Sequence, residues 1–230
     1  MGRLKTIWIT RTRPGAVDSA AAWQAAGYAP IIAPLLDVTP PQNSPQKPDS
    51  SATLIFTSAN GVLAYQSFDF STHHAVITVG DKTALAARSA GFGDVLSADG
   101  QSEDVTALVR AVVPKNTKIV HCAGKHVRGS IIEDLQAAGY SAQRDLYYQS
   151  APVTALPDVD LAALSYVALY SPLAAKTLAA LSPDTSHMTA ISLSPAIDAA
   201  LGDQKFAAKY VSSSPHEAVM IALLLPQSPR

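Results

Sequence analysis

The sequence contains one cysteine, Cys122, among its 230 residues. A single cysteine cannot form an internal disulfide and supplies no cluster of thiolate ligands for a metal. Such sparse use of cysteine is typical of proteins in a reducing compartment, so we expect a cytoplasmic location. The sequence predicts neither a metal site nor a cofactor.

Charge is also scarce, because charged residues make up 15% of the chain and the formal net charge is −1. This balance gives no electrostatic reason to expect a nucleic-acid partner. The longest apolar runs are too short for a membrane-crossing helix, and residues 1–10 lack a signal-peptide core, so we expect no membrane partner. Hydrophobic residues, at 48%, predict a well-packed globular protein.

Several common motifs are absent. There is no G-x-G-x-x-G, no G-x-x-x-x-G-K-[S/T] and no G-x-S-x-G, so dinucleotide, P-loop and hydrolase signatures are all lacking. His73 and His74 are adjacent and point in different directions, which favours a solvated turn over a metal site. His121 and Cys122 face opposite sides of one expected strand and form no nucleophile pair; Cys122 is interpreted as a small core residue.

Two segments of the chain resemble each other. Gln24-Ala-Ala-Gly-Tyr28 recurs as Gln136-Ala-Ala-Gly-Tyr140, so that Gly27 and Gly139 lie 112 residues apart. Nearly the same spacing relates further pairs: 56–60 with 169–173, 77–81 with 191–195, and 99–103 with 213–217. A constant spacing favours an internal duplication and therefore two domains. The alternative is that short strand-turn-helix units look alike in any α/β protein.

Strand-like and helix-like stretches alternate along the chain. This alternation predicts an α/β fold with two similar domains, each a parallel sheet flanked by helices. Gly27 and Gly139 are expected to stop the helices that precede them. The last helix is expected to begin at Ser214-Pro-His-Glu217, a capping box with proline at the first helical position.

The number of strand-helix units indicates how the domains are arranged. About four units lie between the Pro- and Ser-rich linker at 40–51 and residue 150; one precedes the linker and three follow residue 150. If each domain has four, the first unit joins the last three. We therefore predict domain 1 as 1–36 plus 150–230, an inserted domain 2 as 40–146, and antiparallel connectors at 34–40 and 146–152. Two sequential domains, one with a degenerate unit, remain the alternative.

The loops after the expected strands are the candidate site. In parallel sheets, ligands bind outside the carboxyl ends of strands, where loops lead into helix N-termini. Here these loops are rich in hydroxyl groups and several carry a cation, which suits a carboxylate or phosphate ligand; the alternative is that their Ser and Thr residues only cap helices. The loops are 11–15, 57–61, 80–83, 122–128, 170–174 and 192–196.

Motifs in these loops resemble those of the uroporphyrinogen-III synthase family. They are Ile9-Thr-Arg-Thr-Arg-Pro14, Phe56-Thr-Ser-Ala-Asn-Gly-Val62, Val79-Gly-Asp-Lys-Thr-Ala84 with Gly91, Tyr148-Gln-Ser150, Tyr170-Ser-Pro172, and Ser-Ser-Pro-x-x-Ala from Ser213. Each motif is short, but their order and spacing extend over essentially the full chain. The resemblance implies two α/β domains joined by a two-stranded connector.

The resemblance also implies a reaction. The linear tetrapyrrole hydroxymethylbilane is closed to uroporphyrinogen III with inversion of ring D and loss of water, through an azafulvene and a spiro intermediate. Such chemistry needs a positioned substrate more than a strong nucleophile. Tyr148 matches the family's favoured proton donor, and a phenol with a pKa of about 10 can donate at neutral pH. Packing of both Tyr147 and Tyr148 is the alternative.

The same resemblance, applied to the loops, suggests which residues bind the substrate. The chain departs from the family at 192–196, where the glycine and threonines often found are missing, so that no hydroxyl contact from this loop is expected beyond that of Ser194. The family further implies a monomer without cofactor; a two-lobed sensor that binds a small anionic metabolite without turnover is the alternative function. The candidate substrate-binding residues are Arg11, Arg13, Thr57, Ser58, Asn60, Gly80, Lys82, Thr83, Lys125, Arg128, Tyr170, Ser171, Pro172 and Ser194.

Overall fold

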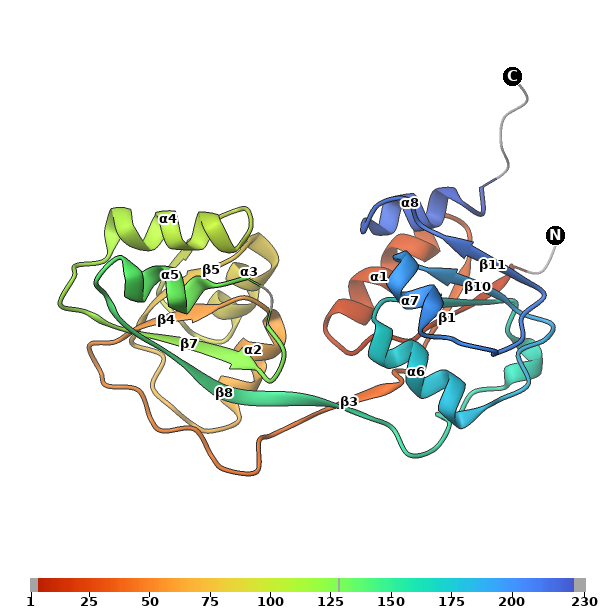
Figure 1. Cartoon of the computed structure of the whole chain (residues 1–230), viewed down its shortest axis with the longest axis horizontal. Helices are drawn as coiled ribbons and strands as arrows, with labels where there is room; N and C mark the ends of the chain where they lie inside the picture. Colours follow the sequence, from red (N-terminus) through yellow and green to blue (C-terminus); the bar gives the residue numbers. More distant parts are fainter. Residues whose placement is uncertain (1–3, 128, 226–230) are drawn as a thin grey trace, which may run out of the picture. The chain divides into compact units, whose positions relative to one another are not determined.

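The structure is a computed structural model that describes residues 4–127 and 129–225. Strands and helices alternate through most of this part of the chain (Figure 1). In chain order the elements are β1 (Thr6–Ile9), α1 (Gly15–Ala25), β2 (Ala29–Ile32), β3 (Leu36–Thr39), β4 (Thr53–Phe56), α2 (Ala59–Gln66), β5 (Ala75–Thr78), α3 (Asp81–Ser89), β6 (Asp94–Ser97), α4 (Ser102–Val112), β7 (Lys118–Gly124), α5 (Ile131–Ala137), β8 (Ser141–Pro152), the 3-10 helix η1 (Leu161–Ala163), β9 (Tyr166–Leu169), α6 (Pro172–Leu181), β10 (Thr189–Ser192), α7 (Pro195–Ala199), β11 (Ala208–Val211) and α8 (Glu217–Ala222).

The chain divides into two compact units. One consists of Met1–Asp37 with Ala151–Arg230, and the other of Val38–Ser150. Each contains a sheet of mainly parallel strands with helices packed against it, which confirms the predicted α/β fold class. The sequence-based domain limits and the antiparallel pairing of the connectors stay predictions.

The first unit is built on a five-stranded sheet with the order β11-β10-β9-β1-β2. Its neighbouring strands pair in parallel. Trp8 of β1 is fully buried in a core on one face, whereas Ile7 and Ile9 belong to a core on the other face with Trp23 of α1. A strand buried on both faces is expected of a parallel sheet that helices cover on both sides.

The second unit is built on a six-stranded sheet with the order β3-β8-β7-β4-β5-β6. The strands from β8 to β6 pair in parallel. Leu54 and Phe56 of β4 pack with Tyr65 on one face, and Ile55 packs with Ile119 in a separate core on the other. The central strand β4 is therefore buried on both sides, as β1 is in the first unit.

The two sheets share one strand order. The series β2-β1-β9-β10-β11 corresponds to β8-β7-β4-β5-β6, at the spacing of about 112 residues that the sequence repeat shows. In each sheet the chain reverses its direction of strand addition at one place, between β1 and β9 or between β4 and β7. Ligands of doubly wound sheets bind at this switch point, beyond the carboxyl ends of the strands.

Two glycines end helices as the sequence predicts. Gly27 and Gly139 follow α1 and α5 with φ angles of +90° and +84°. This left-handed conformation costs glycine little, because it has no Cβ, and it lets the chain leave a helix towards the next strand.

The predicted start of the last helix is wrong. Helix α8 begins at Glu217 after the N-cap His216, without a side-chain cap, and Ser214 and Pro215 lie outside it. The carboxylate of Glu217 accepts hydrogen bonds from Ser19 and Tyr170, two residues far away in the chain. Because this carboxylate binds Ser19 and Tyr170, it does not accept from the backbone N–H of Ser214 as a capping box requires. Tertiary contacts thus prevail over the capping signal in the local sequence.

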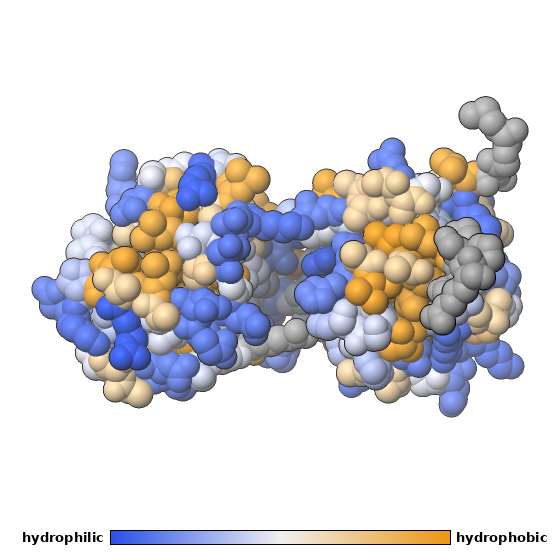
Figure 2. Space-filling view, turned by 90° about the horizontal axis from the view of Figure 1, so that it is seen from above, coloured by the Kyte–Doolittle hydropathy of each residue, from blue (hydrophilic) through white to orange (hydrophobic). Residues whose placement is uncertain are grey.

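The surface mixes apolar and hydrophilic side chains. On the face that Figure 2 shows, apolar areas are bounded by hydrophilic ones on each unit. Within the described ranges, no helix is long and apolar enough to cross a membrane.

Candidate active site

A cavity of about 540 Å³ lies at the switch point of the six-stranded sheet. Thr57 and Ser58 reach it from the loop after β4, residues 126–127 from the loop after β7, and Tyr148 from β8. Residues 100–103, where α4 begins, form another part of its wall. The cavity thus brings together Thr57, Ser58 and Tyr148 from the predicted set, and it adds His126 and Glu103, which the sequence reasoning did not select.

The phenol of Tyr148 is held in this cavity by Ser58. The Oγ of Ser58 lies 2.8 Å from the phenol oxygen and accepts a hydrogen bond from the N–H of Gly61 at 3.2 Å. Ser58 is the N-cap of α2, so the same hydroxyl caps the helix and contacts the tyrosine. The position of Tyr148 is thereby tied to the start of a helix.

Tyr147 and Tyr148 have different surroundings. Tyr147 is fully buried and stacks on Tyr65, with 5.6 Å between the ring centroids. Its hydroxyl has no oxygen or nitrogen partner among the described residues and meets the thiol of Cys122. Burial, with that thiol nearby, raises the pKa of Tyr147. Tyr147 is a core residue, whereas Tyr148 is half-buried and lines the cavity.

Thr57 is held by a buried histidine that the sequence analysis left without a role. The Nε2 of His121 lies 3.1 Å from Oγ1 of Thr57, and the imidazole is only 2% exposed. Burial, and secondarily the positive charge of Arg144, lowers the pKa of His121 to about 4. His121 is therefore neutral at neutral pH, and it orients Thr57 from within the sheet.

The first unit has a polar cluster at its own switch point. Arg11 follows β1, Tyr170 follows β9, and the guanidinium carbon of Arg11 lies 4.9 Å from the centre of the Tyr170 ring. The phenol of Tyr170 donates to Glu217, and burial followed by this carboxylate raises the pKa of Tyr170. The structure thus brings Arg11 and Tyr170 together, and it adds Glu217, Ser19 and Trp23, which sequence reasoning missed.

Other candidate residues stand at helix starts. Ser171 caps α6, its Oγ accepting from the N–H of Ala174 at 3.1 Å, and Pro172 is the first residue of that helix. Gly80 is the N-cap of α3 and Ser194 that of the short α7, where no side-chain cap bond forms. Caps of this kind fit the interpretation of these residues as structural elements as well as the interpretation as ligands.

The remaining candidate residues are spread over different places. Thr83 is buried, Asn60 is half-buried in the first turn of α2, and Arg13, Lys82 and Lys125 are exposed. Lys125 lines a separate cavity of about 500 Å³, together with Arg144 and residues 41–43, 45 and 46. Arg128 lies outside the described residues.

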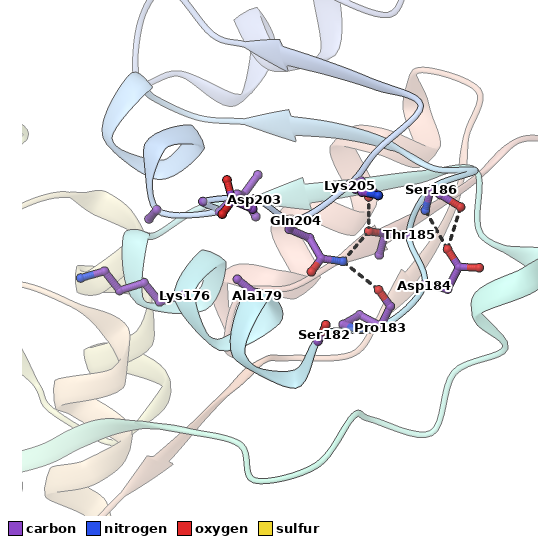
Figure 3. A pocket seen from close by; sticks show the side chains of 13 residues that line it. Lys176, Ala179, Ser182, Pro183, Asp184, Thr185, Ser186, Asp203, Gln204 and Lys205 are labelled. Carbon is purple, nitrogen blue, oxygen red and sulfur yellow. Dashed lines mark hydrogen bonds between the residues drawn. The ribbon is translucent and has the colours of Figure 1, made fainter.

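A further cavity, of about 570 Å³, lies in the first unit before the amino ends of β10 and β11 (Figure 3). Its polar groups bind one another: Nε2 of Gln204 donates to the carbonyl of Pro183 and to Oγ1 of Thr185, both at 2.7 Å, and Thr185 donates to the carbonyl of Lys205 at 2.6 Å. These bonds fasten two loops to each other. The cavity is at the edge of the sheet away from the strands' carboxyl ends, so we do not assign it to the active site.

Metal ligands do not converge in the described part of the chain, since no three or more His, Cys, Asp and Glu side chains there are grouped so that they could hold an ion. The absence of a cofactor from the reaction stays a prediction.

Comparison with known proteins identifies the family. Residues 18–222 match the family described as "Uroporphyrinogen-III synthase HemD". The chain belongs to the uroporphyrinogen-III synthase family. Closure of hydroxymethylbilane to uroporphyrinogen III is the reaction of this family, so the chain is an enzyme of porphyrin biosynthesis with a tetrapyrrole substrate. Among curated proteins the sequence finds no match.

Solved structures of uroporphyrinogen-III synthases resemble the chain in fold. The Helicobacter pylori protein is 17% identical, with a TM-score of 0.62 over 96% of this chain and 98% of that chain. A mutant Thermus thermophilus protein is 13% identical, with a TM-score of 0.45 over 95% of this chain and 97% of that chain. At this identity the first likeness supports the two-domain α/β fold alone.

Proposed function

We propose that the protein is a hydro-lyase that closes hydroxymethylbilane to uroporphyrinogen III, with Tyr148 as the donor of a proton to the departing hydroxyl. One observation supports this role more than any other: Tyr148 is the tyrosine that lines the cavity at the switch point of its sheet, where its phenol oxygen lies 2.8 Å from Ser58. A phenol held in one place among helix-start hydroxyl groups is suited to general-acid catalysis.

The proton balance of the reaction explains why one donor suffices. The C–O bond of the hydroxymethyl group breaks with its electron pair on oxygen, the phenol proton converts the departing group to water, and an azafulvene-type electrophile and a phenolate remain. Ring D then attacks through its substituted carbon to give a spiro intermediate, in which one bond to that carbon breaks and ring D rejoins the chain inverted. The proton released from carbon as the macrocycle forms restores the phenol. Water is the only group lost, which is the net change of a hydro-lyase.

We also propose that polar groups of the candidate set other than Ser58 bind the carboxylate arms of the substrate. Within the second unit, Thr57 and the first amides of α2 and α3 present donors at a positive helix end. Lys125 and Arg144 line the neighbouring cavity and supply positive charge. In the first unit, Arg11 is held against Tyr170, and the starts of α6 and α7 offer further amides.

A cytoplasmic monomer is part of this proposal. The only cysteine of the sequence, Cys122, is buried with a thiol whose pKa burial raises, which suits a compartment where thiols stay reduced. Sedimentation of the purified protein at micromolar concentration tests the assembly state, and a mass above that of one chain would contradict it.

The function itself is tested with freshly generated hydroxymethylbilane. Products are oxidised, and the type I and type III isomers are separated by chromatography. We expect type III to predominate, because spontaneous closure leaves ring D uninverted and gives type I. Formation of type I alone, at the spontaneous rate, would contradict this function and favour the alternative, a protein that binds the metabolite without turnover. No observation in the described part of the structure favours that alternative.

A further inference from the structure

Ser58 joins the start of α2 to the phenol of Tyr148. Its backbone is extended, with φ −156° and ψ 153°, which places the side chain over the first turn of the helix. There Oγ accepts from the N–H of Gly61 at 3.2 Å and lies 2.8 Å from the Tyr148 phenol oxygen. One hydroxyl therefore has two defined partners, and neither is solvent.

Tyr148 is fixed from the other side by strand β7. A Cβ on Gly124 would lie 2.7 Å from Cζ of Tyr148 and 3.0 Å from its phenol oxygen, so the tip of the ring rests against the bare backbone of this glycine. The N–H of Lys125 also donates to the Tyr148 carbonyl at 3.0 Å. With its backbone bonded and its ring against Gly124, the phenol has Ser58 as its fixed polar neighbour.

The hydrogen-bond inventory of Ser58 leaves its proton available for Tyr148. A serine hydroxyl has one proton and two lone pairs. The N–H of Gly61 occupies one lone pair, and either hydroxyl can be the donor in the contact between Ser58 and Tyr148; in one of the two arrangements the proton of Ser58 goes to the Tyr148 oxygen. In that arrangement Tyr148 accepts from Ser58 and keeps its own proton for a group in the cavity. As the phenol gives this proton away, the bond from Ser58 becomes a bond to an anion and strengthens.

We propose that Ser58 is a positioning residue that donates its hydrogen bond to Tyr148 during proton transfer, rather than a ligand of the substrate carboxylates. The inference rests on the proposed role of Tyr148 as proton donor. The phenol proton goes to the departing hydroxyl, Ser58 stabilises the phenolate that is left, and the proton released on ring closure restores the phenol. The positive end of α2 acts in the same direction, because it favours negative charge near Ser58.

The test is a double-mutant cycle on type III formation with Ser58→Ala, Tyr148→Phe and the double variant. Loss of a hydrogen bond to a developing anion predicts that Ser58→Ala lowers kcat about 10- to 100-fold with little change in KM. Ser58→Thr, which keeps the hydroxyl, should restore most of the rate. In the Tyr148→Phe background, Ser58→Ala should have no further effect on kcat, since it acts through the phenol.

A second readout does not depend on turnover. Protein labelled at the ring carbon that bears the tyrosine oxygen gives an NMR signal for Tyr148, identified by its loss in Tyr148→Phe. We expect Ser58→Ala to shift the titration of this signal to higher pH than in the parent, and Ser58→Thr to leave it nearly unchanged. An identical titration in parent and Ser58→Ala would overturn the proposal.

The outcomes separate this inference from the role of Tyr148. If Tyr148→Phe is impaired and Ser58→Ala turns over like the parent, the inference on Ser58 is wrong and the role of Tyr148 stands. If Tyr148→Phe is unimpaired, both are wrong. If the rate losses of the two single variants multiply in the double variant, or if Ser58→Ala raises KM at constant kcat, Ser58 acts as a ligand of the substrate and the proposed positioning role is wrong. Should Ser58→Ala unfold, Ser58→Asp keeps an acceptor for the N–H of Gly61 but has no proton for Tyr148, and the same rate loss is expected.

Discussion

The phenol of Tyr170 donates a 2.5 Å hydrogen bond to Oε1 of Glu217, and these two residues come from the end of β9 and from α8 respectively. The other carboxylate oxygen of Glu217 accepts from Ser19 of α1 at 3.0 Å, and the indole N–H of Trp23 donates to the Tyr170 oxygen at 2.9 Å. One carboxylate thereby fastens two helices to the switch point of the five-stranded sheet.

Loss of this carboxylate should weaken the first unit. Glu217→Ala leaves two buried or half-buried donors without an acceptor, and we expect it to lower the free energy of unfolding by about 1–3 kcal/mol. Chemical denaturation measures the change. Glu103→Ala is the matched control, because Glu103 takes the corresponding place in the repeat but is exposed. Equal losses in the two variants would contradict a special role for Glu217.

The consecutive tyrosines should respond differently to the same substitution. Tyr148→Phe removes the proposed proton donor and should slow type III formation by about 10²-fold without unfolding the protein. Tyr147→Phe removes a buried hydroxyl that lacks an oxygen or nitrogen partner among the described residues, so its free energy of unfolding should stay equal or rise by up to about 1 kcal/mol. Its turnover should match the parent. Undiminished turnover of Tyr148→Phe would remove Tyr148 from the mechanism.

Gly124 should be required for the position of the phenol. Gly124→Ala places a methyl group 2.7 Å from Cζ of Tyr148, so the ring has to move away from Ser58. A displacement of this kind is expected to lower kcat by about 10²-fold. Gly93→Ala is the control, since no atom lies within 4 Å of the added Cβ there. Type III formation by both variants at the parent's rate would show that the contact with Gly124 does not position Tyr148.

Stability should fall in mild acid because of His121. Its pKa is lowered from 6.5 to about 4 in the folded protein by burial and by Arg144, so between these values the unfolded chain binds a proton that the folded protein does not. The contribution of His121 is thus fully present above pH 6.5 and is lost as the pH falls to about 4, a change of about 3 kcal/mol. Denaturation at several pH values should show this slope in the parent and in the exposed-site control His73→Gln. In His121→Gln the slope should be flatter, and an unchanged slope would assign the pH dependence to other groups.

The sequence was sufficient for the fold class because its signals are local. Runs such as Leu54–Phe56 alternate with helix-forming stretches, and Gly27 and Gly139 end two helices with the conformation that only glycine adopts easily. Pro34 is another local signal. It lies between β2 and β3, two strands that belong to different sheets. Because proline has no backbone N–H to donate to a neighbouring strand, the apolar stretch around Pro34 forms two short strands and not one long strand.

The residues that sequence reasoning missed act through long-range contacts. The sequence around Glu217 matches a capping box, yet its carboxylate accepts hydrogen bonds from Tyr170, 47 positions away, and from Ser19, 198 positions away. His121 looked like an ordinary strand residue, and its bond to Thr57 depends on the pairing of β4 with β7. The repeat contained one unused signal, since it aligns Glu217 with Glu103, and acidic residues at equivalent places near two switch points merited selection.

A tyrosine lies near the switch point of each sheet, Tyr148 in β8 and Tyr170 after β9, at places that do not correspond in the repeat, and the two phenols have different hydrogen-bond partners. Tyr170 donates a hydrogen bond to a carboxylate inside its own unit. Transfer of this proton to another group would break the hydrogen-bonded cluster around Glu217. Tyr148 meets a serine hydroxyl instead, a partner that can serve as donor and leave the phenol proton available. The neighbour that each phenol meets therefore sets the role proposed for it: a structural contact for Tyr170 and proton donation for Tyr148.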